Sequence, residues 1–180
     1  SSCLEVTDVP QVECEALVAL YNNTNGSQWL DSTNWLTSTS VSEWYGVSVD
    51  NERVVSLDLN NNQLSGTIPA ELGDLAQLTY LNLSENQLRG EIPDTLGDPP
   101  DLFQLLLSNN QLSGTIPIVL TSLSNLHWLN LDNNQLSGTI PPQLGNLSAL
   151  QILRLNGNLL SGPIPPELGL LSNLVFLRLD

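Results

Sequence analysis

The sequence contains no lysine and no methionine, and it has a single histidine and only two cysteines among its 180 residues. One His and two Cys cannot supply the four side chains of a zinc site built from Cys and His. Four Arg stand against 19 acidic residues, which gives a formal net charge of −15. This charge opposes binding to nucleic acids and to anionic membranes. The sequence also lacks an apolar run of about 18 residues, so it predicts no membrane insertion.

Patterns typical of catalysis are missing as well. The sequence has no Gly-x-Ser-x-Gly segment and no Gly-rich phosphate loop. Its acidic residues are scattered and form no pair of the kind that glycosidases use. The Asp-Asn-Asn segment at residues 132–134 has the oxygen ligands that Ca²⁺ prefers, but EF-hand spacing is absent, so a solvated turn is the better interpretation. We therefore expect no enzyme, no metal site and no cofactor.

A 24-residue repeat organises the chain from residue 54 onward. Its first positions are Val54, Leu78, Leu102, Leu126, Leu150 and Leu174. Each of them opens the pattern L-x-x-L-x-L-x-x-N-x-L, which is followed by x-G-x-I-P and then by x-x-L-G-x-L. Five copies are complete, and a sixth ends at Asp180 after its strand.

The spacing within one repeat predicts a short strand and a return segment. Leu57 and Leu59 are two residues apart, so both point inward, while Asp58 points outward. The Ile of each Ile-Pro pair fills the core, and its Pro prevents a regular α-helix, so the return side is extended or 3₁₀-helical. One repeat cannot bury its own Leu face. Neighbouring repeats must therefore stack, with six parallel strands forming one concave sheet.

An asparagine recurs where the chain leaves each strand. Its short amide can bond backbone groups of the turn that the strand ladder leaves unpaired. We interpret these residues as a structural Asn ladder rather than as catalytic groups. The ladder consists of Asn62, Asn86, Asn110, Asn134 and Asn158.

The 53 residues before the repeats predict a helical N-terminal cap. Asp8 and Gln11 have the spacing of a capping box with Pro10 in the first turn, and Asn25-Gly26 ends the helix. The apolar residues Val12, Ala16, Leu17 and Leu20 share one face of this helix. We expect that face, with Trp29, Trp35 and Trp44, to cover the Leu edge that the first repeat exposes.

The repeat resembles the plant-type leucine-rich repeat family, whose L-x-G-x-I-P motif recurs in five consecutive copies. The resemblance implies an α/β-type leucine-rich repeat solenoid. This fold is a right-handed superhelix with a parallel concave sheet, a short second strand on one flank and a 3₁₀ or extended convex side. We expect a cap at residues 1–53 and repeats at residues 54–180. Pro99-Pro100 departs from the family pattern, which predicts a locally altered turn.

The segment at residues 43–47 resembles the W-x-G-V core of the family's N-terminal cap. Cysteines usually flank that motif, but Ser42 and Val49 stand in their places, so that disulfide is missing. Cys3 and Cys14 remain as an even pair, which predicts one disulfide and an extracellular or cell-surface location. Two free thiols are the alternative, and a third interpretation takes Ser1-Ser2-Cys3 as the remnant of a lipoprotein processing site.

Several outward strand positions carry aromatic, apolar or basic residues instead of Ser, Thr and Asn. Clustered exposed groups of this kind mark binding surfaces, although strands also favour aromatic residues in their own right. We predict that the concave face binds a ligand. The predicted site residues are Tyr80, Phe103, His127, Trp128, Ile152, Arg154, Phe176 and Arg178.

A protein or peptide is the expected ligand, and a cell-wall carbohydrate is the leading alternative, because aromatic rings stack on sugars and amides bond their hydroxyls. An ice-binding surface is a further alternative. Its Thr column, made of Thr67, Thr115 and Thr139, is interrupted by Glu91 and Pro163. A structural spacer without a ligand is the last alternative.

The last strand of the sequence has no covering repeat after it. Leu174, Leu177 and Leu179 would then lack a neighbour, and a backbone edge would be unpaired. We expect either that the chain is a fragment of a longer array or that two copies associate weakly end to end as a homodimer.

Overall fold

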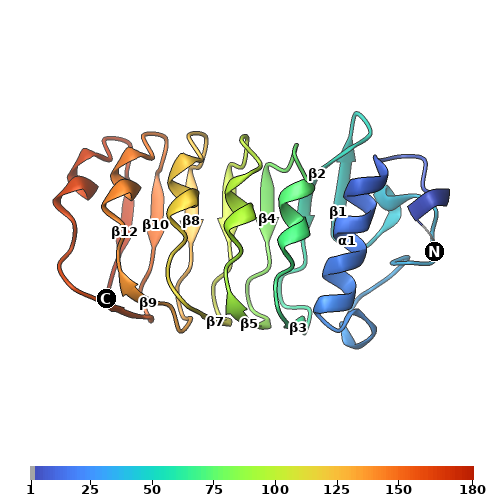
Figure 1. Ribbon diagram of the computed structural model, residues 1–180, viewed down its shortest axis with the longest axis horizontal. Coiled ribbons are helices and arrows are strands. Elements are labelled where there is room, and N and C mark those ends of the chain that lie inside the picture. Colours follow the sequence, from blue (N-terminus) through green and yellow to red (C-terminus); the bar gives the residue numbers. More distant parts are fainter. Residues whose placement is uncertain (1–2) are drawn as a thin grey trace.

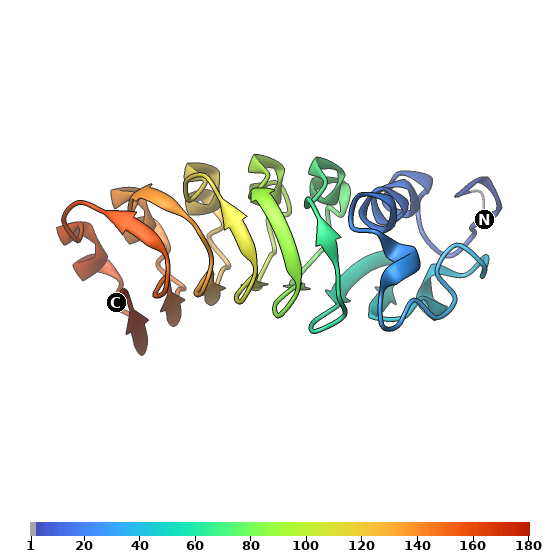
Figure 2. The same ribbon diagram turned by 90° about the horizontal axis from the view of Figure 1, so that it is seen from below.

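The computed structural model describes residues 3–180, and Ser1 and Ser2, on which the lipoprotein interpretation depends, lie outside the described residues. The chain forms a row of stacked coils that runs from the N-terminal helix to the C-terminus (Figure 1). Seen from below, the row bends into a shallow arc (Figure 2). Helical turns line the outer side of the arc and the main strands line its inner side. The predicted solenoid is confirmed.

The concave sheet has seven strands in the order β1-β2-β4-β6-β8-β10-β12. The six predicted parallel strands are all present, and β1, at the end of the predicted cap, adds an antiparallel seventh. The strand bounds are Val47–Asp50 for β1, Arg53–Asp58 for β2, Tyr80–Asn82 for β4, Gln104–Leu106 for β6, Trp128–Asn130 for β8, Ile152–Arg154 for β10 and Phe176–Arg178 for β12.

Short second strands run along one flank, as the resemblance implied. They are β3 (Ser65–Gly66), β5 (Gln87–Glu91), β7 (Gln111–Ser113), β9 (Ser137–Thr139) and β11 (Leu159–Ser161). The strands β3, β5 and β7 form one parallel ladder, and β9 pairs with β11 in another. Each flank strand leads into the convex side at the Pro of the Ile-Pro pair.

The convex side consists of one 3₁₀ turn per repeat, because each Pro ends the extended segment and opens the turn. These turns are η4 (Ala70–Asp74), η5 (Asp94–Gly97), η6 (Ile118–Ser122), η7 (Pro142–Asn146) and η8 (Pro166–Leu170). The turn before Pro99-Pro100 is the altered one: η5 has four residues where the others have five, and it ends at Asp98 in a right-handed helical conformation. The inward Leu residues, such as Leu81 and Leu83, lie fully buried between sheet and turns.

The cap contains the helix α1 (Gln11–Asn23) and the 3₁₀ turns η1 (Cys3–Glu5), η2 (Gly26–Gln28) and η3 (Val41–Glu43). The predicted capping box is wrong. Pro10 occupies the N-cap position without a side-chain bond. The Asp8 carboxylate instead accepts the backbone N–H groups of Val41 at 2.9 Å and Ser42 at 2.8 Å. Asp8 therefore ties the start of the cap to η3 rather than to α1.

The buried face of α1 also differs from the prediction at one residue. Val12 is 46% exposed. The face that packs on the first repeat consists of Glu13, Cys14, Ala16, Leu17 and Leu20. Glu13 precedes Ala16 by three residues and Leu17 by four, so it shares their face of the helix, where its carboxylate bonds Arg53 and the Val54 N–H.

Trp29, Trp35 and Trp44 are buried in the cap, as expected. Their rings meet in sequence, with centroids 4.8 Å apart for Trp29 and Trp35 and 5.0 Å apart for Trp35 and Trp44. Each indole N–H donates to a backbone carbonyl, that of Thr24, Tyr45 and Ser38 respectively. The cap core is thus both packed and fully hydrogen-bonded at its indoles.

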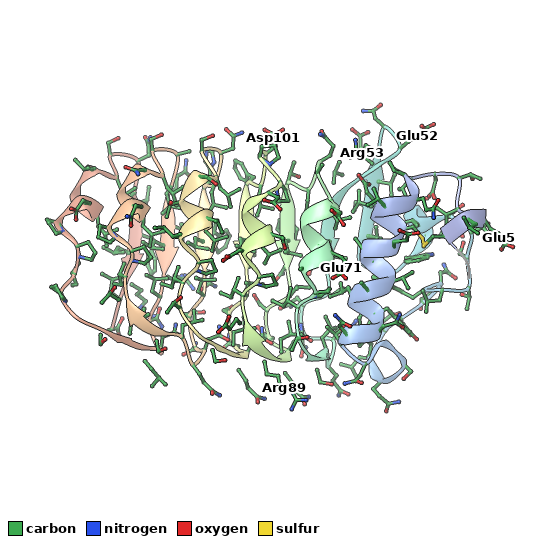
Figure 3. The ribbon with its side chains drawn as sticks, in the orientation of Figure 1. Glu5, Glu52, Arg53, Glu71, Arg89 and Asp101 are labelled. Atoms are coloured by element: carbon green, nitrogen blue, oxygen red, sulfur yellow. A yellow bond between two sulfur atoms is a disulfide. The ribbon has the colours of Figure 1, made fainter. Side chains whose placement is uncertain are left out.

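The predicted disulfide is confirmed. The Cys3 and Cys14 sulfur atoms are bonded, and the bond joins η1 to α1 (Figure 3). At the other end of the solenoid, β12 is the edge strand of the described sheet, and Leu177 on it is 43% exposed. End-to-end pairing through this edge stays a prediction. Among residues 3–180, no helix is long and apolar enough to cross a membrane.

Candidate functional site

The concave sheet presents its outward residues in columns, with one residue from each strand. The register aligns Trp128, Ile152 and Phe176 in one column and Asn130, Arg154 and Arg178 in the next. Phe103 and Phe176 are 42% and 38% exposed, and Arg178 is exposed. The other predicted site residues, Tyr80, His127, Trp128, Ile152 and Arg154, are half-buried. The structure therefore gathers all eight on the concave side, on the strands β4 to β12 or just before them.

Phe103 and His127 form a stacked pair at the start of β6 and β8. Their ring centroids are 4.1 Å apart and their planes differ by 21°. The His127 Nδ1 atom lies 2.7 Å from the Asn125 carbonyl oxygen, which fixes the ring and makes Nδ1 the N–H donor. The result is a flat aromatic platform whose other imidazole nitrogen is available to a ligand.

Arg154 and Phe176 form a second aromatic contact two strands further along. The Arg154 guanidinium carbon lies 4.7 Å from the centre of the Phe176 ring, within the range of a cation–π interaction. Two of the four arginines of the chain, Arg154 and Arg178, stand side by side here in the register of β10 and β12. Arg178 Nε lies 4.0 Å from Asp180 Oδ1, so the two guanidinium groups at this end of the concave face have a carboxylate beside them.

The N-terminal half of the face carries polar groups that bond one another. The Tyr80 hydroxyl donates to Asp58 Oδ2 at 3.4 Å and accepts Asn82 Nδ2 at 3.2 Å. Burial raises the pKa of Tyr80, and the negative charge of Asp58 raises it further. Tyr80 is thus a neutral, satisfied member of a small network.

Two residues important to the surface escaped the sequence analysis. Asp132 and Asn156 lie two residues after the last residues of β8 and β10, and Asp132 belongs to the segment where a solvated turn was expected. Asp132 is only 7% exposed. The outward residues Leu106 and Asn130 are also buried, although their strand positions predicted exposure. The repeat period places these residues in a column, but it does not show how neighbouring side chains cover them.

The Asn ladder binds consecutive repeats together. The Asn110 amide donates to the carbonyls of Leu83, Leu107 and Ser108, and its oxygen accepts the Leu88 N–H at 2.9 Å. Asn86, Asn134 and Asn158 make equivalent bonds to the repeat before them. Asn62 does the same toward the cap, where it bonds the backbone of Asp31 in both directions.

No group of three or more His, Cys, Asp or Glu side chains within residues 3–180 is placed to hold a metal ion. The arrangement on the concave face instead suits contact with a ligand of some length. Its four strands β6 to β12 carry aromatic rings, two guanidinium groups and buried polar groups.

Comparisons with known proteins agree with this architecture. The sequence pattern of the family described as "Leucine rich repeat" matches residues 52–112, and a second pattern with that description matches residues 125–147 and 149–171. A chain of the BIR3–SERK2 complex from Arabidopsis thaliana is 38% identical, with a TM-score of 0.74, over 88% of this chain and 87% of that one. No curated protein matches the chain.

Two further structures share the fold over part of their length. The Arabidopsis receptor kinase HAESA, in complex with the peptide hormone IDA and the co-receptor SERK1, is 35% identical with a TM-score of 0.68. A plant ice-binding protein is 31% identical with a TM-score of 0.84. They match 93% and 92% of this chain, and the chain spans 33% of the HAESA chain and 54% of the ice-binding one.

Proposed function

Because the chain belongs to the leucine-rich repeat family, we propose that it is an extracellular recognition module that binds a peptide or protein segment on its concave sheet. The fold is a binding fold rather than an enzyme fold. The Cys3–Cys14 disulfide supports the extracellular location, since such bonds persist in oxidising compartments. Identity of 35% to HAESA, which was solved with a peptide hormone and a co-receptor, supports the ligand class.

One observation carries the proposal. The concave face exposes the Phe103–His127 stack and the Arg154–Phe176 pair where a bare scaffold would show small polar residues. Aromatic and Arg side chains supply most of the energy in protein interfaces. Their arrangement across β6 to β12 favours an extended ligand that crosses several strands.

A carbohydrate is the second candidate ligand. It is favoured by the half-buried Trp128 and by the polar side chain of Asn130 on the same face of β8, since sugars combine an apolar ring face with many hydroxyls. An ice-binding role is favoured by the similarity to a plant ice-binding protein. The flank strands argue against ice binding. Arg89 and Glu91 on β5 place charges where the other flank strands and the residues just after them carry Ser and Thr.

The test is a selection of random linear peptides displayed on phage against the folded protein. Peptides that are enriched are then titrated by calorimetry against the wild type and against Phe103→Ser and Phe176→Ser. We expect each substitution to weaken binding by more than about fivefold, which corresponds to about 1 kcal/mol. Gln111→Ser, on the flank strand β7, is the matched control and should bind like the wild type.

Other outcomes separate the alternatives. Binding on a glycan array without any enriched peptide would replace the proposal by carbohydrate recognition. Thermal hysteresis in solution would favour ice binding. Peptides that bind the two Phe variants and the wild type equally would place the site on another face.

A further inference from the structure

Four polar side-chain atoms within residues 3–180 are inaccessible and have no hydrogen-bond partner in the protein. They are Trp128 Nε1, Asp132 Oδ1, Arg154 Nε and Asn156 Oδ1. All four belong to two consecutive repeats, those of β8 and β10. Buried polar groups are nearly always paired, so a local group of four unpaired atoms requires an explanation.

These residues lie next to one another on the concave face. Arg154 pairs with Asn130 in the register, so it is a diagonal neighbour of Trp128. The segments that carry Asp132 and Asn156 are joined by a backbone bond of 2.9 Å from Asn133 N–H to the Asn156 carbonyl. Diagonal neighbours in a sheet are about 7–8 Å apart, which long side chains can span. The four atoms are thus carried by residues of two adjacent repeats, a set that we call the β8–β10 patch.

Comparable groups elsewhere in the protein are satisfied. The indoles of Trp29, Trp35 and Trp44 all donate to backbone carbonyls, whereas the indole of Trp128 does not. Tyr80 and Asn82, at the other end of the same face, bond each other. The unpaired state is therefore a property of the β8–β10 patch and not of the concave face as a whole.

The chemistry of the patch restricts what can complete it. Trp128 Nε1 and Arg154 Nε are donors, while Asp132 Oδ1 and Asn156 Oδ1 are acceptors. A carboxylate has no N–H or O–H to offer and would meet the charge of Asp132. An ammonium group has no acceptor and would meet the charge of Arg154. A primary carboxamide has two N–H donors and an oxygen with two lone pairs, which matches two donors and two acceptors.

We propose that the β8–β10 patch binds the side-chain carboxamide of an Asn or Gln residue in the ligand. This inference rests on the proposed peptide-binding function and names the ligand residue that the concave face selects. The ligand amide donates to Asp132 and Asn156 and accepts from Trp128 and Arg154.

Entry of the amide requires the side chains that now cover these atoms to turn. Arg154 lies against Phe176, and both Arg154 and Trp128 are partly exposed. Partly exposed side chains change rotamer quickly compared with ligand binding. The ligand amide then supplies hydrogen-bond partners to groups that have none in the protein. Binding therefore favours Asn and Gln over apolar residues of similar size.

The experiment uses the random-peptide selection, carried out in parallel on the wild type and on Asp132→Ala. Peptides selected on the wild type should be enriched in Asn or Gln at one position, and those selected on Asp132→Ala should lose that enrichment. In a selected peptide, replacement of this residue by Asp or Leu should weaken binding at least tenfold. Asn60→Ala, in the same column on the first repeat, is the control and should keep the preference.

A second readout follows Trp128 itself. Trp128→Phe removes one of the four indole N–H signals from a ¹⁵N-correlation NMR spectrum and so assigns the signal of Trp128, which should move when the Asn or Gln peptide binds. Trp128→Phe should bind that peptide at least fivefold more weakly, which keeps the proposal testable should Asp132→Ala fail to fold. Selected peptides without Asn or Gln enrichment, or an unmoved Trp128 signal, would overturn the inference while the proposed function stands. A selection that yields no peptide would contradict the proposed function itself.

Discussion

Glu13 on the cap helix bonds the first residue of the repeat array. Its Oε2 accepts the backbone N–H of Val54 at 2.7 Å, and its Oε1 accepts Arg53 Nε at 2.5 Å. Glu13 is completely buried, while about a third of the Arg53 side chain is exposed at the boundary between α1 and β2 (Figure 3). One carboxylate thus satisfies a backbone N–H near the start of β2 and the guanidinium beside it, while β1 pairs with the edge of that strand.

We predict that Glu13→Ala lowers the free energy of unfolding by about 1–3 kcal/mol, because the buried Val54 N–H loses its acceptor. Chemical denaturation followed by circular dichroism measures the change. Glu15→Ala on the same helix is the control, since Glu15 is exposed and, among residues 3–180, bonds only Gln11. Equal stabilities for the two variants would mean that the bonds of Glu13 to Arg53 and Val54 do not stabilise the protein.

The Asn ladder yields a second prediction. Asn110→Ala should lower the free energy of unfolding by about 1–3 kcal/mol, since the Leu88 N–H loses its acceptor and the carbonyls of Leu83, Leu107 and Ser108 each lose one of their two donors. Gln111→Ala, one residue later and exposed, is the suitable control. Asn109 is a poorer control, because its φ of 53° makes substitution by Ala costly in itself. Identical thermal midpoints for Asn110→Ala and Gln111→Ala would contradict a structural role of the ladder.

The disulfide should stabilise the cap by about 2–3 kcal/mol through the short loop that it closes. Cys3→Ser tests this, because it leaves the buried Cys14 in place. Reducing agent should lower the thermal midpoint of the wild type and leave that of Cys3→Ser unchanged. Detection of two thiols in the unfolded, unreduced protein would show that the bond is not formed.

Acid should weaken the link between Asp8 and η3. Burial opposes ionisation of Asp8, but the N–H groups of Ser42 and Val41 and the Ser42 hydroxyl outweigh it, so the pKa of Asp8 lies below its ordinary value of 3.8. A lowered pKa contributes stability that is present above the unfolded-state value and is lost as the pH falls through the folded-state value. Wild type should therefore exceed Asp8→Asn in stability at neutral pH, and the difference should vanish in acid below the folded-state pKa. A difference that persists unchanged in strong acid would contradict this.

End-to-end association of the 180-residue chain is tested by sedimentation over a range of concentrations. If the exposed edge of β12 pairs two copies, the mean mass rises with concentration, and Leu177→Lys abolishes the rise by placing a charge in the contact. Val175→Lys is a useful comparison, since Val175 is exposed just before the strand. A mass that stays that of one chain at high concentration would exclude the pairing.

The repeat pattern alone determined the solenoid. A Leu every two or three residues, an Asn at each strand exit and an Ile-Pro pair every 24 residues leave one way to bury the apolar face, which is stacking. For the same reason the inward and outward sides of each strand, the 3₁₀ turns and the altered turn before Pro99-Pro100 followed from local spacing. The Trp core of the cap was predictable too, because an uncovered Leu edge demands apolar cover.

Only the tertiary structure decided which groups distant in the sequence form hydrogen bonds with one another. Asp8 bonds residues 33 and 34 positions away, and Glu13 bonds residues 40 and 41 positions away, which no local pattern encodes. The burial of Asp132 and the unpaired indole of Trp128 likewise depend on which side chains of adjacent repeats lean over them. Periodicity specifies the column in which a residue stands. The rotamers of its neighbours, set by packing across repeats, determine whether its polar atoms find a partner in the protein or stay unpaired.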